Sequence, residues 1–523
     1  MRMMFRFAFS LSLLPMLMIL TGAASERPPN SGIIAIWYNG QNDPIISQPW
    51  IHGGQVMVQW ADVDKGPGQY DFSSIESELS ALAKTGRAAT VQINGNKKPD
   101  YLFTMCPYFP KVLDNQINDK KGTLMYWHPA HEKAFRDMLA AFAKYIKSSP
   151  SRKALLGIRM NFNALGTEHV KVPEANQSLN GWITPQGVEP GTAWTQAQAD
   201  AYKDRIFQTY IDEMVPDIFV FARSSEGKEL VDKNEKYFMS GQMGLFHTSF
   251  RAEPTNEQQT FGRYGIYQKY CLPGYTLGYT EAEGDCWGQL GAKQTPRFCS
   301  PPQWNYWRLL SQMHIGVSYI GVYTRDLDVA LNGKYDSKIQ VKWPKGDVPQ
   351  YQDEFRKAYE FANVYAGYHA IPAKSPGAWI AFREGNTLKG DYFMHMKRLQ
   401  DETTVPPANT PIGPDNSRFG AWARYLPAGK SMNLVLNSAF ADSLKNQQAE
   451  IRVTYLDDAA QGTLRLLAGG KTFEAPRKGS GQWQVLTGVV AGAELKPNAT
   501  GAQITLEAKD AQIPLHMVEV VRK

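Results

Sequence analysis

Two glutamates stand where a pair of carboxyl groups could break a glycosidic bond. Glu168 closes the stretch "NFNALGTEH", and Glu281 lies in "GYTEAEGDCWG"; each follows a run that is typical of a buried strand. Two carboxyl groups about 5 to 5.5 Å apart hydrolyse such a bond with retention of configuration, one as nucleophile and the other as acid/base. The acid must keep its proton at the working pH, and burial or a like-charged neighbour raises its pKa for that purpose. The pair therefore predicts glycoside hydrolysis if the fold brings both groups together.

The second glutamate has acidic neighbours that compete for the same role. Glu283 lies two residues after Glu281 and shares its face in an extended chain, so it is the alternative nucleophile. Asp285 completes three carboxylates at alternate positions, but a calcium loop needs further oxygen ligands that this stretch lacks. The chain also lacks a Gly-x-Ser-x-Gly elbow, a Walker loop and a His-Glu-x-x-His pair. We expect no metal and no cofactor.

Strand-like and helix-like patterns alternate along the first two thirds of the chain, and these elements must position the glutamates. The apolar runs are "GIIAIWY" (32–38), "GQVMVQW" (54–60), "AATVQIN" (88–94), "LLGIRMNF" (155–162), "DIFVFAR" (217–223), "KYFMSGQMGLF" (236–246), "YTLGYTE" (275–281) and "GVSYIGVY" (316–323). Amphipathic segments separate them, for example "SSIESELSALAKTG" and "HEKAFRDMLAAFAKYIKS". Eight such units predict an α/β fold, a (β/α)8 TIM barrel over residues 26–375, with an open doubly wound sheet as the alternative.

In such a barrel the functional groups follow the carboxyl ends of the strands. The strand-four and strand-seven ends carry Glu168 and Glu281, which places the two glutamates on opposite sides of the barrel mouth. Other polar and aromatic residues at these ends are candidates for substrate binding: Tyr38, Trp60, Asn94, Asn163, His247, Trp287 and Arg325. Trp60, Trp287, Tyr38 and Trp37 are candidates for stacking on sugar rings, with packing at the barrel rim as the alternative. His247 is a candidate to orient a hydroxyl, or is structural. Arg325 is a candidate to meet an anionic group, or is simply solvated.

The last part of the chain has a different pattern of apolar and polar residues. Residues 376–523 contain alternating β-type runs such as "MNLVLNSAF", "AEIRVTYLDD" and "AQITLEAK", and the helical period largely disappears. Pro, Gly and Asn mark a loop or linker around residues 400–420. We predict an all-β sandwich of jelly-roll type for this region.

The N-terminal segment and the cysteines indicate export. Residues 1–25 have two arginines, an apolar run and a small-residue cleavage zone, as a secretory signal peptide does. The mature protein is then secreted or periplasmic, with no membrane span. In that setting Cys106, Cys271, Cys286 and Cys299 favour disulfides over a zinc site, although their pairing stays open. The net charge of +6 is too small for a nucleic-acid binder, and nothing in the sequence indicates the oligomeric state.

One segment carries a resemblance to a known group of enzymes. Residues 53–103, "GGQVMVQWADVDKGPGQYDFSSIESELSALAKTGRAATVQINGNKKPDYLF", resemble the second and third βα units of clan A glycoside hydrolases and are most similar to family 42 β-galactosidases. The resemblance implies that Glu168 is the acid/base and Glu281 the nucleophile. It departs at Thr167, where the clan usually has the Asn that binds the sugar 2-hydroxyl. Asn163, Asn161 and Arg159 are candidates to replace that contact.

These observations together predict an exported retaining glycoside hydrolase whose partner is a carbohydrate. The resemblance and the mild basic charge favour a β-linked galactan, including sulfated algal galactans of the agar or carrageenan type. A non-catalytic glycan-binding protein is the alternative from another class. A polysaccharide lyase is a further alternative, which the lack of an obvious Tyr/His base cluster disfavours.

Overall fold

The computed structural model describes residues 26–224, 228–250, 263–282, 284–291, 299–336, 338, 340–383, 390–399, 403–404 and 412–523. The predicted signal peptide and Glu283 lie outside these residues. No helix in the described ranges combines the length and the apolar character needed to cross a membrane.

A closed barrel of parallel strands forms the first part of the described chain, which confirms the predicted (β/α)8 architecture. Its strands are β1 (Gly32–Ile36), β2 (Gly53–Gln59), β5 (Ala88–Asn94), β8 (Leu155–Arg159), β9 (Val220–Arg223), β10 (Met243–Phe250), β11 (Gly278–Ala282) and β12 (Tyr319–Tyr323). They are hydrogen-bonded in the order β1-β12-β11-β10-β9-β8-β5-β2, and the barrel closes where β2 meets β1. Because each strand is covered on both faces, these runs are rich in apolar residues and almost continuously buried.

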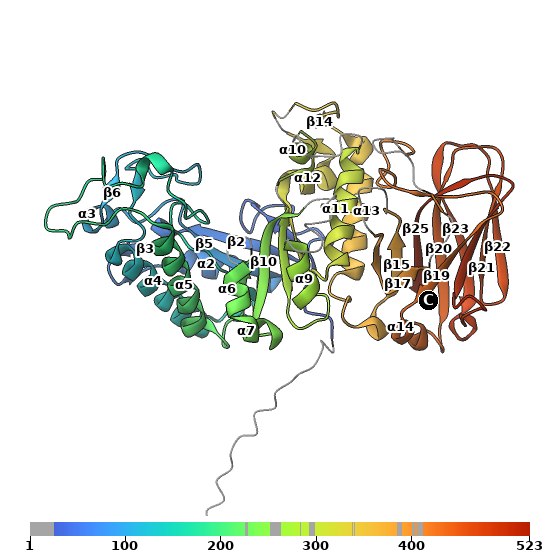
Figure 1. Cartoon of the computed structure of the whole chain (residues 1–523), viewed down its shortest axis with the longest axis horizontal. Coiled ribbons are helices and arrows are strands. Elements are labelled where there is room, and N and C mark those ends of the chain that lie inside the picture. The colour runs from blue at the N-terminus through green and yellow to red at the C-terminus, as the bar shows by residue number, and fades with distance from the viewer. Residues whose placement is uncertain are drawn as a thin grey trace, which may run out of the picture.

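Helices surround the barrel on its outer side (Figure 1). The longer ones are α2 (Ser73–Lys84), α4 (Pro129–Ser148), α5 (Gln196–Met214), α9 (Arg263–Tyr270), α11 (Pro301–His314), α12 (Thr324–Asn332) and α13 (Pro349–Tyr365). Short ones are α1 (Trp60–Val63), α3 (Leu102–Met105), α6 (Lys228–Lys233), α7 (Glu235–Met239) and α10 (Cys286–Gly291). Their starts follow capping rules: α4 has Pro129 at its first position, and the His128 side chain accepts a hydrogen bond from the Ala130 N–H. α12 ends at Gly333, which takes the left-handed conformation.

Several observed strands are shorter than the predicted runs, and the fifth and sixth runs show why. In the sixth run, residues 235–239 form helix α7, and the strand β10 starts only at Met243. Gly241, with a φ of 70°, ends the helical turn and reverses the chain between them. In the fifth run the strand starts at Val220, because residues before it close the turn after α5. Short apolar runs do not distinguish a helix turn from a strand, which explains the first error.

Two antiparallel sheets follow the barrel and pack face to face, which confirms a β-sandwich. The first contains β16 (Tyr392–Met394), β15 (Gly377–Ala381), β25 (Ile513–Arg522), β20 (Gln448–Asp457) and β23 (Gln482–Ala491), with β18 (Arg424–Leu426) beside β25. The second contains β17 (Met396–Arg398), β19 (Ser431–Leu436), β24 (Ile504–Lys509), β21 (Thr463–Ala468) and β22 (Lys471–Pro476), and helix α14 (Ser438–Ser443) lies at one end. Inward-facing residues of both sheets form one apolar core, which includes Ile451, Leu466 and Val518.

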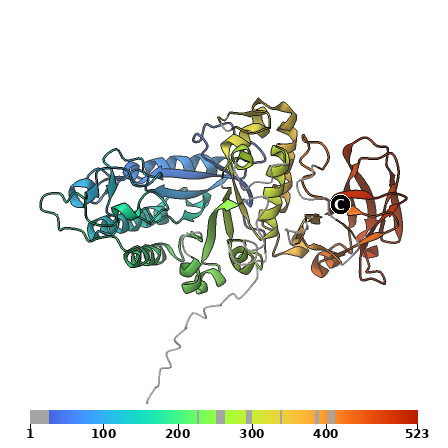
Figure 2. The ribbon, with the colours of Figure 1, turned by 45° about the horizontal axis from the view of Figure 1, so that its top comes forward.

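The sandwich is docked on the barrel through helix α11. Figure 2 shows this helix between the barrel and the sheets. Almost every residue of α11 is buried, because one side faces the barrel and the other faces the sandwich. Trp307 donates a hydrogen bond to the Gly420 carbonyl at 2.7 Å, and its ring meets Trp422 edge-on at 4.9 Å. The two parts therefore share an apolar interface.

Two long loops cover one side of the barrel mouth. The loop after β5 contains the small hairpin β6 (Tyr108–Phe109) and β7 (Thr123–Leu124), and the loop after β8 contains Glu168. A backbone bridge between Tyr108 and Ile183 joins the two loops, and Trp127 packs edge-on against Trp182 at 5.2 Å. The loop that carries Glu168 is therefore held by the loop before it.

The disulfide prediction is wrong. All four cysteines lie in the described part of the chain and are buried, and no disulfide joins them. Cys286 instead places its backbone N–H and its thiol against the Asp326 carboxylate, at 2.9 and 3.3 Å. Burial raises the pKa of that thiol, so it stays protonated and behaves as a small apolar side chain. The sequence predicted disulfides from the number of thiols and the expected export, but it contains no information on which thiols are close to each other.

Candidate active site

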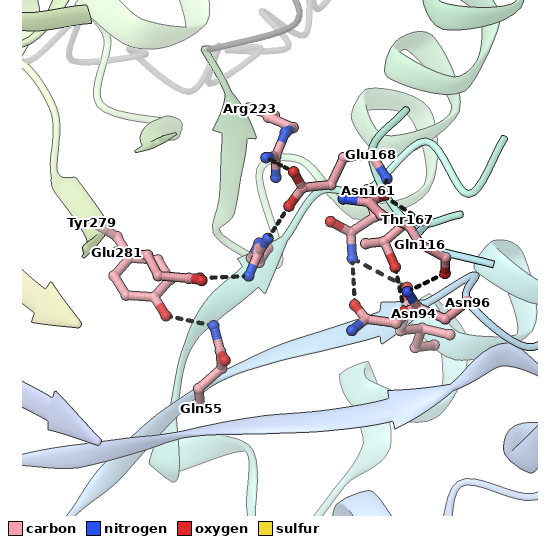
Figure 3. Close-up of polar contacts among 12 residues, drawn as sticks. Gln55, Asn94, Asn96, Gln116, Asn161, Thr167, Glu168, Arg223, Tyr279 and Glu281 are labelled. Carbon is pink, nitrogen blue, oxygen red and sulfur yellow. Dashed lines mark hydrogen bonds and ion pairs between the residues drawn. The ribbon is translucent and has the colours of Figure 1, made fainter. Parts of the chain in front are cut away.

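One arginine inside the barrel holds both candidate glutamates. Arg159, the last residue of β8, donates from Nη1 to Glu281 Oε2 at 2.9 Å and from Nη2 to Glu168 Oε1 at 2.7 Å. Strands β8 and β11 are separated by β9 and β10 in the barrel, so the contact with Glu281 crosses the lumen. Figure 3 shows the two glutamates directed at the same guanidinium. The expectation that the strand-four and strand-seven carboxylates lie close together agrees with this geometry.

The shared guanidinium limits the distance between the glutamates. Its two terminal nitrogens are about 2.3 Å apart in the planar group, so the two bound oxygens are at most about 8 Å apart. Carboxyl groups of retaining glycosidases are about 5 to 5.5 Å apart, and those of inverting ones about 6.5 to 9.5 Å. The separation is compatible with either stereochemical course.

Glu281 is buried and receives two donors. Besides Arg159, the hydroxyl of Tyr323 at the end of β12 donates to Glu281 Oε1 at 2.7 Å. Burial, together with the nearby Glu281 charge, raises the pKa of Tyr323 far above its usual value, so this hydroxyl keeps its proton and acts as a donor. Both oxygens of Glu281 are thus oriented, and its negative charge is compensated.

Glu168 is held in an ionised state. Its side chain is 17% exposed and pairs with Arg159 and with Arg223, the last residue of β9. Burial opposes ionisation, but the guanidinium groups of Arg223 and Arg159 outweigh it and lower the pKa of Glu168 below its usual value. Both guanidinium groups also lie over the ring of Phe246, at 4.0 and 5.4 Å from its centroid. This environment differs from the one that an acid catalyst requires.

The loop after β5 fixes the backbone that carries Glu168. Gln116 Oε1 accepts hydrogen bonds from the N–H groups of Thr167 and Glu168, at 3.2 and 3.0 Å. The Thr167 hydroxyl donates to Asn96 Oδ1 at 2.7 Å, also visible in Figure 3. Lys98 also joins the loops after β5 and β8, since its ammonium donates hydrogen bonds to the carbonyls of Gly95 and Leu165 at 2.9 and 2.7 Å. Burial lowers the pKa of Lys98 to about 7.

Sequence reasoning missed several residues of this site. Arg223 and Tyr323 are the last residues of their strands, so the period-two counting that placed Glu281 at a strand end could have found them as well. Arg159 was considered only as a substitute contact for a hydroxyl. Gln116 left no signal, because it lies in an irregular loop 52 residues before Glu168.

Two of the predicted substrate-binding residues stay at the mouth. Asn94, at the end of β5, accepts a hydrogen bond from Asn161 Nδ2 at 3.0 Å. His247 lies on β10 beside Thr280 of β11 and is 5% exposed. Arg325, on α12, has a side chain that is 59% exposed and pairs with Asp285 at 3.3 Å, so much of its charge is already compensated.

The predicted stacking role is wrong for Trp60 and Trp287, because both rings are fully buried. Trp60 donates to Asp64 at 2.9 Å and packs against Phe135. Trp287 lies flat on Tyr335 at 3.9 Å between centroids and donates to the Pro344 carbonyl. Each tryptophan starts or enters a short helix whose inner side faces the core, so its ring packs under the rim rather than on it.

Two further predictions are also wrong. Asn163 is fully buried, and its Nδ2 donates to the Ile93 carbonyl at 3.0 Å, which makes it a structural residue with a left-handed φ of 50°. Tyr38 lies over Gly54 on the outer face of β2, where its hydroxyl approaches Glu78 of α2 at 3.4 Å. It therefore points away from the glutamate pair. Trp37 beside it is 57% exposed and packs edge-on against Tyr323 at 4.4 Å.

The remaining acidic residues near Glu281 have structural partners. Asp285 Oδ1 accepts from the Gly288 N–H at 2.7 Å, as a residue at a helix start does, and Asp285 also contacts Tyr335 and Arg325. The runner-up nucleophile, Glu283, lies outside the described residues. Among the residues that the structure describes, no group of three or more His, Cys, Asp and Glu is arranged to hold a metal ion.

Comparison with known proteins identifies no family for this chain. No protein-family model matches the chain, and the comparison with curated proteins found no match. Among solved structures, the chain is similar to a carbohydrate-binding module of Cellvibrio mixtus lichenase 5A in complex with cellotriose, at 11% identity over 24% of this chain and 90% of that one. It is also similar to the C-terminal CBM6 of LamC, a marine laminarinase from Zobellia galactanivorans, at 12% identity over 24% and 98% of the two chains. The TM-score is 0.16 in both cases, so these likenesses carry no argument about function.

Proposed function

We propose that this protein is an exported retaining glycoside hydrolase that cleaves a β-linked poly- or oligosaccharide with Glu281 as nucleophile and Glu168 as acid/base. The observation that supports it most is the guanidinium of Arg159, which holds one oxygen of each glutamate across the barrel mouth. Two carboxylates at this distance, on opposite sides of a barrel mouth, match what bond cleavage between sugars needs.

The environment of Glu281 suits a nucleophile. A nucleophilic carboxylate must be ionised and correctly oriented before it attacks the anomeric carbon. Arg159 and Tyr323 orient the Glu281 carboxyl, since each donates to a different oxygen. Attack forms a glycosyl–enzyme ester on Glu281 while the bond to the leaving oxygen breaks, and that oxygen takes the proton of Glu168. Glu168 then accepts a proton from water, which hydrolyses the ester and restores both groups.

The environment of Glu168 restricts the pH at which this cycle runs. The first step needs protonated Glu168, but its two arginine partners favour the anion. The active fraction of the enzyme therefore grows as the pH falls toward the lowered pKa of Glu168. We propose an acidic pH optimum, in keeping with a protein that works outside the cytoplasm.

The substrate class rests on resemblance. Residues 53–103 resemble the corresponding units of family 42 β-galactosidases, so a galactan is the proposed substrate. Agar, carrageenan and plant β-1,4-galactan represent its neutral and sulfated forms.

The test is incubation of the chain with these galactans and with other plant and algal polysaccharides, followed by product analysis. Glu281→Gln and Glu168→Gln should each lower kcat by at least about 1,000-fold, because one removes the nucleophile and the other the proton donor. Glu174→Gln is the matched control, since that glutamate has an exposed side chain in the same loop as Glu168. NMR of the first product should show the retained β-anomer. Wild-type rates in both glutamate variants would refute the site.

A non-catalytic glycan-binding protein is the second candidate, and one observation favours it. Both glutamates are compensated by fixed donors, as in a site that holds a ligand without chemistry. Binding of an oligosaccharide with no release of reducing ends between pH 3 and pH 8 would support this candidate. Products that absorb in the ultraviolet would instead indicate a lyase.

A further inference from the structure

Strand β2 has an edge that β1 covers only in part. β2 pairs with β5 along its whole length, from Gly53 to Gln59. With β1 it pairs only at Gly53 and Gly54, in the part of the chain that the structure describes. The carboxyl-terminal half of β2 therefore borders an opening in the wall of the barrel, next to the site of the glutamates.

A cavity of about 360 Å³ lies at this opening, and we call it the β2 groove. Its lining includes Trp37, Met57, Gln55 and Glu78. Trp37 is 57% exposed and Met57 39% exposed, although large apolar side chains are usually covered. Two such side chains lining one cavity form an apolar surface of the kind that binds ligands.

Trp37 has a strained backbone conformation at this position. Its φ of 60° is a left-handed conformation that bulky residues rarely adopt, so the surrounding structure must stabilise it. The ring packs edge-on against Tyr323, whose hydroxyl holds Glu281. The exposed ring is therefore one side chain, that of Tyr323, away from the proposed nucleophile.

The groove also contains a polar group without a partner. Gln55 is 4% exposed and donates from Nε2 to the Tyr279 hydroxyl at 2.8 Å, while its Oε1 accepts no hydrogen bond from the described part of the chain. A buried acceptor of this kind is costly unless a donor reaches it. A sugar hydroxyl entering the groove supplies such a donor, and the Glu78 carboxylate offers another acceptor.

We infer that the β2 groove is a subsite for one neutral glycosyl ring next to the scissile bond, with the ring stacked on Trp37. A sugar fits because its C–H face suits an aromatic ring and its hydroxyls suit Gln55 and Glu78. A neutral sugar fits because the lining includes a carboxylate and, among the described residues, neither Lys nor Arg. A sulfated ring would meet the negative charge of Glu78. The inference rests on the proposed function and specifies which substrates that site takes.

The test measures binding in the Glu281→Gln variant, so that turnover does not interfere. The probes are agarotetraose and β-1,4-galactotetraose, which are neutral, and a κ-carrageenan tetrasaccharide, which is sulfated. Calorimetric titration should give tighter binding for a neutral probe than for the sulfated one. Adding Trp37→Ala should weaken the neutral binding by about tenfold, in line with the loss of one aromatic stacking contact. Trp37→Phe should restore most of it.

The control is Tyr275→Ala, which removes another exposed aromatic side chain and should leave binding unchanged. The inference is wrong if Trp37→Ala binds as tightly as its parent, if the sulfated probe binds best, or if neither neutral probe binds at millimolar concentration. Its failure is separable from that of the proposed function. Hydrolysis by wild type with no effect of Trp37→Ala overturns only the subsite, whereas Trp37-dependent binding without hydrolysis overturns only the enzyme.

Discussion

At the scale of single residues, the proposed acid/base role of Glu168 depends on whether its carboxyl group is protonated. Two guanidinium groups contact this carboxylate, and each stabilises its ionised form. Arg159 contacts both Glu168 and Glu281, whereas Arg223 on β9 contacts Glu168. Arg223 can therefore be replaced without removing the arginine that joins the two glutamates. In the proposed mechanism Arg159 orients both glutamates, whereas Arg223 acts only on the pKa of Glu168.

Arg223→Met should move the alkaline limb of kcat/KM to higher pH, because burial raises the pKa of Glu168 and one of the two guanidinium charges that oppose this effect is then missing. The limb moves to higher pH because the proposed acid, Glu168, must be protonated, and a higher pKa keeps it protonated over a wider pH range. Rates measured between pH 3 and pH 8 give the limb directly. Arg223→Lys should stay near wild type, and Arg205→Met is the matched control, because Arg205 pairs with the distant Glu132. A limb that does not move in Arg223→Met would contradict the role of Glu168.

At the scale of elements, the loops after β5 and β8 act together to present Glu168. The carboxylate lies on an irregular loop rather than on a strand, so its position depends on neighbouring backbone and side chains. Gln116 accepts two consecutive N–H groups there, and Asn96 binds the Thr167 hydroxyl. Positioning of reacting groups is sensitive to shifts of about 1 Å, which can change rates by about 100-fold.

Gln116→Leu should therefore lower kcat by roughly ten- to a hundredfold with little change in KM, since the loop moves while the binding surface on β1 and β2 stays. Steady-state kinetics on the substrate found in the polysaccharide panel provide the measurement. Gln177→Leu is the control. Gln177 donates a hydrogen bond to the Val172 carbonyl in the loop after β8, which also carries Glu168, but this bond does not involve Glu168. A purely structural role for Gln116 would appear as lower thermal stability with unchanged kcat.

At the scale of the whole molecule, the barrel and the sandwich meet around a cluster of histidines. His314, His369 and His395 line a cavity of about 290 Å³ at this junction, together with Lys397. Burial lowers the pKa of each of the three to about 4. Arg383 and Asp391 also act on His314, with opposite signs. The junction is therefore built with neutral imidazoles.

This arrangement makes the folded protein sensitive to acid. The unfolded chain binds a proton at each histidine below about pH 6.5, whereas the folded chain resists it down to about pH 4, so stability falls as the pH drops through that window. Each histidine should contribute roughly 2 kcal/mol of lost stability at pH 5. Urea unfolding at pH 7 and pH 5 measures the loss. His395→Asn, which suits the left-handed φ of 59° there, should reduce the difference in unfolding free energy between pH 7 and pH 5. An unchanged difference would contradict the role of the histidines in acid sensitivity.

The order of elements was predictable from sequence, and the reason is local. Alternating and helical apolar patterns record which face of each segment is buried, so eight strand–helix units and a later β-region are visible before any contact is known. Glu281 was placed at the end of a strand by the same alternation. The boundary errors, such as the helix α7 inside a predicted strand, arise where a short apolar run fits either element.

The composition of the site was decided by tertiary structure. Nothing in the spacing shows that Arg159 and Arg223 meet Glu168, or that Gln116 binds its backbone, because these contacts join segments that only the closed barrel brings together. The same holds for Trp60 and Trp287. The sequence pattern predicted them at the barrel mouth, but packing against neighbouring segments buries both rings. The sequence by itself therefore determined the barrel, the sandwich and the two glutamates. The closure of the barrel decided the charge state of Glu168 and left Trp37 exposed, since packing between distant segments sets both burial and electrostatic partners.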